Sequence, residues 1–195
     1  MDEADIREAA RRLARAWRDG ATIPRLPEPY RPRSTSDAYA IELALLAELG
    51  ETLAGWKVSL AQDHGLMAGL LVGSRVHPAG ATLDVGGFSM RGVEIEIGFR
   101  FDRAFPPRDA AYARAEIEAG VTAFVGVEIV DTRFASYNDT PPLERMADFL
   151  ANGAYVVGPE RADWRNFDLT QLENYVAFDG LDQARRVGGH PSRDP

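Results

Sequence analysis

The sequence contains no cysteine among its 195 residues, and this absence excludes several kinds of site. A chain without cysteine has no disulfide, no thiolate ligand for a metal and no cysteine nucleophile. Histidine is also scarce, with three residues, so a site for a soft metal is not expected. A metal site in this chain would therefore depend mainly on oxygen ligands, which suit Mg²⁺, Mn²⁺ or Ca²⁺.

Other absences narrow the class of protein. No apolar run approaches the ~20 residues of a membrane span, and residues 1–5, Met-Asp-Glu-Ala-Asp, are acidic where a signal peptide is basic. The net charge of −8 argues against nucleic acid or an anionic membrane as the main partner. The sequence has no glycine-rich phosphate loop, no Gly-x-Ser-x-Gly elbow and no His-Glu-x-x-His motif. We therefore expect a cytoplasmic globular protein without a nucleic-acid or membrane partner.

Lysine is nearly absent as well. The 22 basic residues comprise a single lysine, Lys57, and hence 21 arginines (22 minus 1). Because arginine has taken the other cationic positions, this lysine suggests a site that needs a compact ammonium group rather than a guanidinium. Strand alternation over residues 55–60 places Lys57 and Ser59 on one face, opposite an apolar face. The alternative is a solvated strand lysine without a special role.

Two acidic segments have the spacing of strand residues. Glu94 and Glu96 flank one apolar residue, and Glu128 follows 32 positions later (128 minus 96). Alternate residues of a strand project from the same face, with Cβ atoms about 7 Å apart after two residues. If a neighbouring strand brings up Glu128, the three carboxylates can converge on one divalent cation. The alternative is a Glu-x-Glu pair on the solvent face of an amphipathic strand, which needs no metal.

Hydrophobic periodicity predicts two helices followed mainly by strands. Helical spacing covers residues 3–18 and again about 34–49, with an extended proline-rich segment at 24–32 between them. Beyond residue 55, strands are expected at 55–60, 91–101, 121–131, 154–158 and 172–179, with one helix at 109–119. Since these elements do not alternate as βαβ units, the expected class is α+β. We expect a helical N-terminal arm at 1–52 and a β-rich metal-binding domain at 53–195.

Five segments, within a region from residue 37 to residue 191, together carry a family pattern. They are Gly55-Trp-Lys57-Val-Ser, Val93-Glu94-Ile-Glu96-Ile-Gly-Phe, Val127-Glu128-Ile-Val-Asp131-Thr-Arg133-Phe, Met146-Ala-Asp148 through Gly158, and Gly189-His190-Pro191. In this order they resemble the fumarylacetoacetate hydrolase superfamily, and within it the 2-keto-4-pentenoate hydratase and 4-oxalocrotonate decarboxylase branch. The combination of Glu-x-Glu, a later glutamate and an upstream lysine is what makes the resemblance specific.

The resemblance implies a mixed β-roll or barrel-like fold of the fumarylacetoacetase type. It also implies a metal-dependent lyase of the hydratase or decarboxylase type, or a hydrolase, of the kind used in aromatic catabolism. Such an enzyme acts on a small 2-oxo acid through a metal-stabilised enolate. By the same resemblance, Lys57 matches the lysine beside the metal. The three glutamates match the ligands of Mg²⁺ or Mn²⁺, namely Glu94, Glu96 and Glu128.

Three further residues are second-tier candidates. Asp148 matches a family position and is expected near the water shell of the metal. His64 follows closely after the lysine strand and is either an acid or base of the site or a histidine on a surface loop. Arg133 is expected to pair with Asp131, two positions earlier on the same strand face, and to shape the edge of the site. His190, in the Gly-His-Pro turn, is expected to have a structural role.

The sequence also departs from the family pattern. The usual Lys-hydrophobic-Gly reads Lys57-Val-Ser59, and the usual Ala-Asp-Asn-Ala-Ser reads Ala147-Asp148-Phe149-Leu150-Ala151. The acidic residue that hydratases carry after the lysine strand has no clear counterpart near residues 73–76, and family members continue well beyond the point where this chain ends. Because unpaired sheet edges favour association, we expect a homodimer or a higher homo-oligomer. The alternative function is a shortened, catalytically inactive member that acts as a binding or assembly module.

Overall fold

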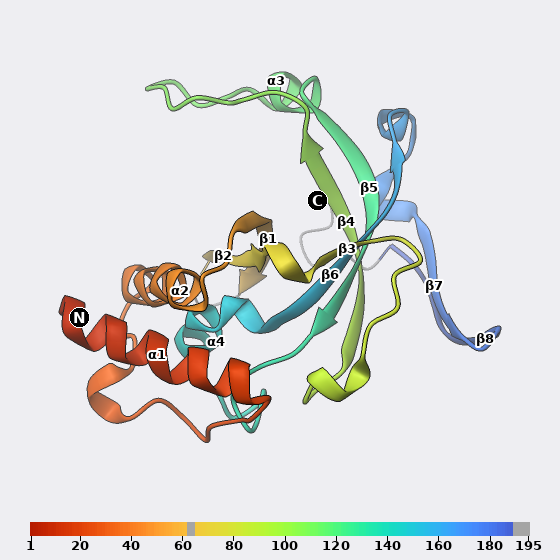
Figure 1. The fold of residues 1–195 in the computed structure, drawn as a ribbon. Coiled ribbons are helices and arrows are strands. Elements are labelled where there is room, and N and C mark those ends of the chain that lie inside the picture. The colour runs from red at the N-terminus through yellow and green to blue at the C-terminus, as the bar shows by residue number, and fades with distance from the viewer. Residues whose placement is uncertain (62–64, 189–195) are drawn as a thin grey trace. The chain divides into compact units, whose positions relative to one another are not determined.

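The computed structural model describes residues 1–61 and 65–188 as a mixture of helices and three β-sheets (Figure 1). The α-helices are α1 (Glu3–Asp19), α2 (Thr35–Leu49), α3 (Arg114–Glu118) and α4 (Pro142–Ala147). The strands are β1 (Leu53–Ala61), β2 (Gly65–Val72), β3 (Val76–Pro78), β4 (Gly92–Phe101), β5 (Val121–Val130), β6 (Asn152–Arg161), β7 (Glu173–Phe178) and β8 (Leu181–Val187). Short 3₁₀ segments lie at Glu28–Tyr30, Gly73–Arg75, Val85–Gly87, Phe149–Ala151, Trp164–Asn166 and Leu169–Gln171.

The strands form two hairpins and one larger sheet. β1 pairs with β2 and β7 with β8, both antiparallel, while the four-stranded sheet has the order β3-β6-β5-β4. Helices thus precede and interrupt strands without regular alternation, as the α+β prediction expected. The described residues show no closed barrel, so the barrel-like closure is not confirmed.

Local signals placed the two long helices correctly. The side chain of Asp2 accepts a hydrogen bond from Asp5 N at the start of α1, and that of Ser34 accepts one from Asp37 N at the start of α2. Gly20 and Gly50 end these helices in the left-handed conformation that glycine adopts readily. Capping at both ends therefore explains why these boundaries could be read from the sequence.

Contacts divide the chain into two compact units. Unit 1 comprises residues 1–94 and 128–156, and unit 2 comprises residues 95–127 and 157–195. The expected division into an arm at 1–52 and a domain at 53–195 stays a prediction. Within unit 1, however, the two N-terminal helices share one core with β2 and with the segment around α4.

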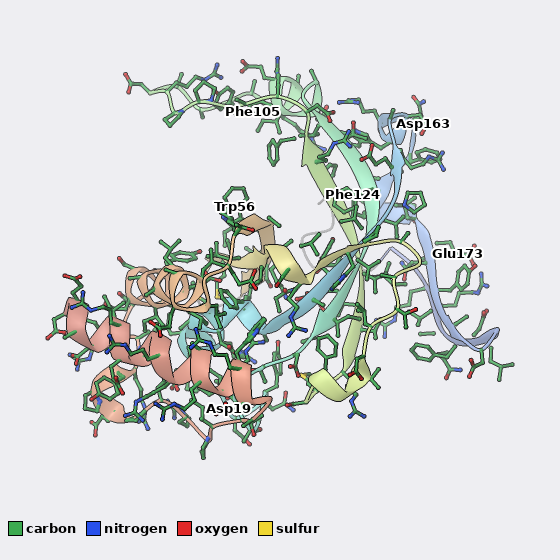
Figure 2. The ribbon with its side chains drawn as sticks, in the orientation of Figure 1. Asp19, Trp56, Phe105, Phe124, Asp163 and Glu173 are labelled. Carbon is green, nitrogen blue, oxygen red and sulfur yellow. The ribbon has the colours of Figure 1, made fainter. Side chains whose placement is uncertain are left out.

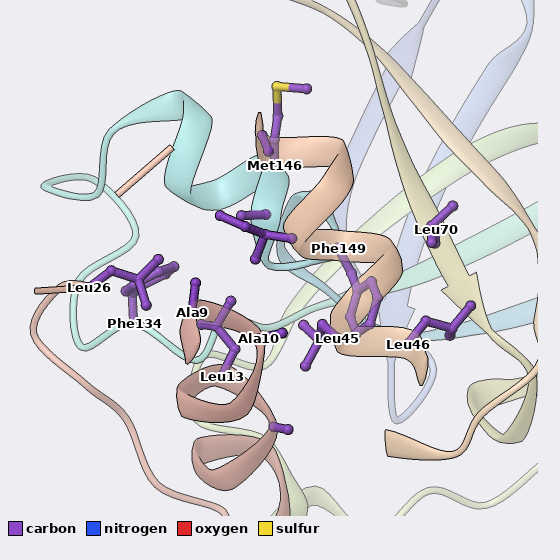
Figure 3. Close-up of a cluster of buried hydrophobic side chains, with 14 of the residues drawn as sticks. Ala9, Ala10, Leu13, Leu26, Leu45, Leu46, Leu70, Phe134, Met146 and Phe149 are labelled. Carbon is purple, nitrogen blue, oxygen red and sulfur yellow. The ribbon is translucent and has the colours of Figure 1, made fainter. Parts of the chain in front are cut away.

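The core of unit 1 forms where α1 packs beside α2 (Figure 1). Figure 3 shows Leu13 of α1 and Leu45 of α2 in one cluster with Met146 and Phe149, and all four side chains are fully buried. Burial of such side chains contributes roughly 1.5–3 kcal/mol each relative to exposure. Unit 1 thus has a substantial apolar core beside the hairpin β1–β2.

Unit 2 has a much smaller core. Its buried cluster contains Val121, Ala123 and Trp164, with Phe99 and Leu169 packed against it. The rings of Phe99 and Trp164 meet edge to face at 5.2 Å, which is a favourable aromatic geometry. In the part of the chain that the structure describes, no helix combines the length and the apolar character needed to cross a membrane.

Candidate metal centre

The structure brings together the three glutamates that the spacing singled out. One carboxylate oxygen from each of Glu94, Glu96 and Glu128 lies within 4.8 Å of the other two. Glu94 and Glu96 stand two positions apart on β4, and β5, which carries Glu128, is the neighbour of β4 in the sheet. Glu94 is exposed, Glu96 is partly buried and Glu128 is fully buried. The expected convergence is thus observed, whereas metal binding stays a prediction.

Lys57 lies directly beside the buried glutamate. Its Nζ donates hydrogen bonds to both carboxylate oxygens of Glu128 at 2.6 Å, and 9% of its side chain is exposed. A buried charge is tolerated when it is paired and hydrogen-bonded. The alternative of a solvated strand lysine is therefore wrong.

The hairpin β1–β2 carries Lys57 toward the interior and turns its apolar face outward. Trp56 and Val58, the neighbours of Lys57 along β1, each have 59% of their surface exposed, and the label in Figure 2 marks Trp56. This arrangement follows from strand alternation, because residues next to Lys57 must project from the opposite face. Lys57 thus points inward, whereas Ser59, two positions later on the same face, is exposed.

Asn152 completes the surroundings of the buried carboxylate. Its Nδ2 donates to Glu128 Oε1 at 2.8 Å, and the residue is 1% exposed at the start of β6. The two oxygens of Glu128 therefore receive an ammonium and an amide. Sequence reasoning missed Asn152, because an asparagine just before a glycine reads as a turn residue.

A left-handed turn lies next to this cluster. Phe149, Leu150 and Ala151 have φ values of 53°, 50° and 58°, although none of them is glycine. Non-glycine residues in this region cost roughly 1–2 kcal/mol each. The turn directs the carbonyl oxygen of Leu150 to within 3.3 Å of Lys57 Nζ, which donates to it. The strained turn thus supplies Lys57 with a third hydrogen-bond acceptor, the carbonyl oxygen of Leu150.

Asp148 and Arg133 form a buried pair of their own. Both oxygens of Asp148 are engaged, since Oδ2 accepts from Thr132 Oγ1 and from Arg133 N, and Oδ1 accepts from Arg133 Nε. Burial raises the pKa of Asp148, while the guanidinium of Arg133 acts to lower it. These contacts support a structural role for Asp148 better than a place near the metal.

The expected pair between Asp131 and Arg133 is wrong. Asp131 instead accepts hydrogen bonds from the backbone N–H groups of Ser89 and Met90, at 2.8 and 2.7 Å. The physical reason is that β5 ends at Val130, so strand alternation no longer applies to residues 131–133. Arg133 therefore pairs with Asp148 rather than lying at the edge of the site. His64 and the Gly-His-Pro segment with His190 lie outside the described residues.

The donor set fits a hard divalent cation. Oxygens bound ~2.1 Å from Mg²⁺ lie at most about 4.2 Å apart, and those around Ca²⁺ lie up to about 5 Å apart. At most one pair among three oxygens can lie on opposite sides of an octahedral Mg²⁺, and the other pairs are about 3.0 Å apart. Closing the observed spread of up to 4.8 Å therefore needs side-chain shifts of up to about 1.8 Å. Three carboxylates and the ammonium of Lys57 sum to a charge of −2, which one dication would neutralise. The oxygen ligands and their net charge therefore suit a divalent cation, and they do not distinguish Mg²⁺ from Ca²⁺.

The fold resembles that of solved structures of a decarboxylase. The 4-oxalocrotonate decarboxylase from Pseudomonas putida G7, complexed with magnesium and adipate, gives a TM-score of 0.82 at 18% identity, over 98% of this chain and 78% of that chain. The same protein complexed with calcium and acetate gives 0.80 at 18% identity, over 98% and 77%. No protein-family model and no curated protein matches the sequence. The likeness confirms the resemblance that the order of the motifs predicted, at the level of the fold.

Proposed function

We propose that the chain is a divalent-metal-dependent enzyme of the fumarylacetoacetate hydrolase type. In this proposal Glu94, Glu96 and Glu128 bind Mg²⁺ or Mn²⁺. The substrate is a small 2-oxo acid, and the reaction is hydration, decarboxylation or hydrolysis of a carbon–carbon bond. The observation that carries the proposal is the convergence of three carboxylates beside the only lysine of the chain. The likeness to a decarboxylase complexed with magnesium supports it.

When bound, a dication would supply Lewis-acid stabilisation of the negative charge that develops on a chelated 2-oxo acid. Around it, Glu128 and Asn152 would hold their positions through buried hydrogen bonds. The fixed side chains of this cluster would keep the reacting geometry constant, which is the main requirement for catalysis by orientation.

Lys57 would hydrogen-bond the substrate carboxylate or transfer a proton to the reacting carbon. Its ammonium has three N–H groups and faces three acceptors, the two oxygens of Glu128 and the carbonyl oxygen of Leu150. Engaging a substrate therefore requires the loss of one of these contacts. The contact with Leu150, at 3.3 Å, is the longest of the three.

A second candidate is a binding or assembly module without turnover. It is favoured by Phe149, which is fully buried in the core where the family pattern has a polar amide. The amide of Asn152 at Glu128 works against this alternative, since it supplies a polar group to the centre. The two candidates differ in turnover and not in metal binding.

Metal binding is tested by thermal unfolding with Mg²⁺, Mn²⁺ or Ca²⁺, each with and without oxalate. Oxalate is a planar dicarboxylate that mimics the enolate. Linkage predicts stabilisation of about 2.7 kcal/mol when the ligand is at 100 times its dissociation constant. Glu96→Gln is expected to abolish the shift, whereas Glu3→Gln, at a position with 81% of the side chain exposed, is the matched control. No shift with any of these metals would contradict the proposal.

Turnover is tested by following the absorbance of 2-hydroxydienoates, oxaloacetate and acylpyruvates in the presence of the metal. The proposal expects consumption of at least one of these compounds and its loss in Lys57→Met. Metal-dependent stabilisation without consumption of any of them would favour the binding module.

A further inference from the structure

The hairpin that carries Lys57 has an outer edge closed by side chains and not by a third strand. Within it Gly69 pairs with Lys57, and the residues on either side of Gly69 are Ala68 and Leu70. A two-stranded hairpin alone is marginally stable. In an antiparallel pair, alternate N–H groups point away from the partner strand, so Ala68 and Leu70 present theirs on one edge. These two groups need acceptors from elsewhere in the chain.

Helix α2 supplies both acceptors. Ala68 N donates to Tyr39 Oη at 3.0 Å, and Leu70 N donates to Glu42 Oε1 at 2.7 Å. Tyr39 and Glu42 lie three positions apart on the helix, so they share one face. One helix face thus takes the place of an edge strand along β2.

The burial of Glu42 costs free energy, because its carboxyl group is removed from water. The residue is 1% exposed and has the fully buried Ile41 and Leu45 on the same helix. Burial raises the pKa of Glu42 to about 8, although the N–H of Leu70 acts to lower it. A leucine there would avoid the cost of burying a carboxyl but would leave that N–H without an acceptor. The hydrogen bond to β2 is therefore the contact that explains a carboxyl here.

The other side of β2 is fixed by the left-handed turn. A Cβ atom on Gly69 would lie 2.6 Å from Leu150 Cβ and 2.8 Å from the carbonyl oxygen of Phe149. The strand therefore approaches the turn as closely as a bare backbone allows. The carbonyl oxygen of Leu150 in this turn also accepts a hydrogen bond from Lys57. A displacement of β2 would therefore change the packing of Gly69 against the turn and the hydrogen bond of Lys57 to it.

We propose that Tyr39 and Glu42 are positioning residues for Lys57. They hold the outer edge of β2, whose Gly69 is the register partner of Lys57, and so set where the ammonium meets Glu128. The role of Lys57 toward a substrate rests on the proposed function. The placement of Lys57 by α2 is independent of the proposed function.

The single lysine makes this placement directly observable. Labelling with ¹³C-lysine gives one ε-CH₂ signal in an NMR spectrum, and this signal reports the surroundings of Lys57 without any turnover. Tyr39→Phe and Glu42→Leu are expected to shift it, because each removes one acceptor from the edge of β2. Glu42→Gln keeps an acceptor oxygen and is expected to restore the wild-type signal. Tyr30→Phe, whose ring stacks against Arg12, is the matched control without effect.

Activity gives a second measurement if the wild-type chain turns over substrate. Misplacement of a reacting group by about 1 Å can cost on the order of 100-fold, so Glu42→Leu is expected to lower kcat roughly 10- to 100-fold. If Lys57 transfers a proton, KM is expected to change much less than kcat, because the metal ligands stay in place; if it binds the substrate carboxylate, KM is expected to rise as well. Glu42→Gln is expected to recover most of kcat.

Folded Tyr39→Phe and Glu42→Leu proteins with an unchanged Lys57 signal would overturn the inference, whatever happens to their melting temperatures. If Glu42→Leu does not fold, Tyr39→Phe decides alone, since it deletes a single hydroxyl. A wild-type chain without turnover contradicts the proposed function but leaves the NMR comparison intact. Normal turnover with an unmoved signal contradicts the positioning role alone.

Discussion

Unit 1 and unit 2 are held together by different interactions. Unit 1 buries one continuous apolar cluster drawn from α1, α2, β2 and the segment around α4. Unit 2 buries a small cluster around Trp164 and carries many exposed ion pairs. They include Arg100 with Asp102 and Glu160, Arg108 with Glu116, Arg161 with Asp163, and Arg185 with Glu173 and Asp182. Unit 1 has exposed pairs too, such as Arg7 with Glu3, but it has the large apolar cluster in addition. Exposed pairs contribute little to stability, so unit 1 should carry most of the folding free energy.

The comparison also explains where fixed polar groups occur. Lys57, Glu128 and Asn152 all belong to unit 1, and all three are buried or nearly so. A centre that must hold its geometry needs neighbours whose own rotamers are fixed by packing. The large core of unit 1 provides such neighbours. The small cluster of unit 2 provides them at only a few positions.

The largest expected effect is at the buried ion pair of unit 1. Glu128→Leu leaves the ammonium of Lys57 without its carboxylate, and breaking a buried pair costs about 3–5 kcal/mol. Urea unfolding should show this loss in the free energy of unfolding. The double variant Lys57→Met/Glu128→Leu removes both charges and is expected to recover much of it. A double variant as unstable as Glu128→Leu would contradict the pairing.

Packing provides the next largest contrast. Leu45→Ala in unit 1 empties a fully buried position and is expected to cost about 2–5 kcal/mol. Phe178→Ala in unit 2 truncates a side chain that is 55% exposed and should stay within about 0.5 kcal/mol. The two unfolding curves are measured side by side. Equal losses would show that the two units do not differ in this way.

The free energy of unfolding should depend on pH because of the buried carboxyl of Glu42 in unit 1. The folded-state pKa of Glu42 is about 8, above its ordinary value of 4.5, so the folded state retains a proton that the unfolded state has lost between these values. Stability is therefore fully present below about pH 4.5 and falls as pH rises toward 8, by at most about 1.4 kcal/mol per pH unit. Glu42→Gln should flatten this slope in unfolding measured at several pH values. Asp148 also has a raised pKa and contributes in the same direction, and besides burial its charge is one of the causes that raise the pKa of Glu42. An unchanged slope would contradict the raised pKa.

The smallest effect is expected at an exposed pair of unit 2. Hydrogen bonds from Arg108 and from the N–H of Ala113 lower the pKa of Glu116 to about 2. Arg108→Ala should leave the melting temperature unchanged, while the pKa of Glu116 rises toward its ordinary range in an NMR titration. A large loss of stability would show that surface pairs support unit 2 after all.

Most features that the sequence predicted have a local cause. Alternation of side chains along β4 and the neighbouring position of β5 account for the glutamate cluster, and Gly20 and Gly50 account for the ends of the long helices. The alternation on β4 and the helix ends are signals within a few residues of the feature they predict, whereas the approach of Glu128, 32 positions after Glu96, depended on β5 lying beside β4. This is why the local signals survive without knowledge of the tertiary structure.

The missed features depend on distant or competing contacts. β2 lacks the alternation of a half-buried strand, since five of the residues from 67 to 72 are buried. The helix expected at 109–119 begins only at Arg114, because Arg108 and Tyr112 bond backbone carbonyls of the preceding loop. The left-handed turn at 149–151 has no glycine to signal it. Tertiary contacts decide the first and the third of these features, whereas local side-chain bonds within residues 106–112 delay the start of the helix.

The single lysine has a consequence for the chemical handling of this protein. Reagents that attach dyes, biotin or cross-linkers to proteins react mainly with exposed amines. Here the ammonium of Lys57 is buried against Glu128, and the amino group of Met1 is paired with Asp37. Such reagents should therefore modify the folded chain slowly. Once they do react at Lys57, they report an opening of the candidate metal centre and not the accessible surface.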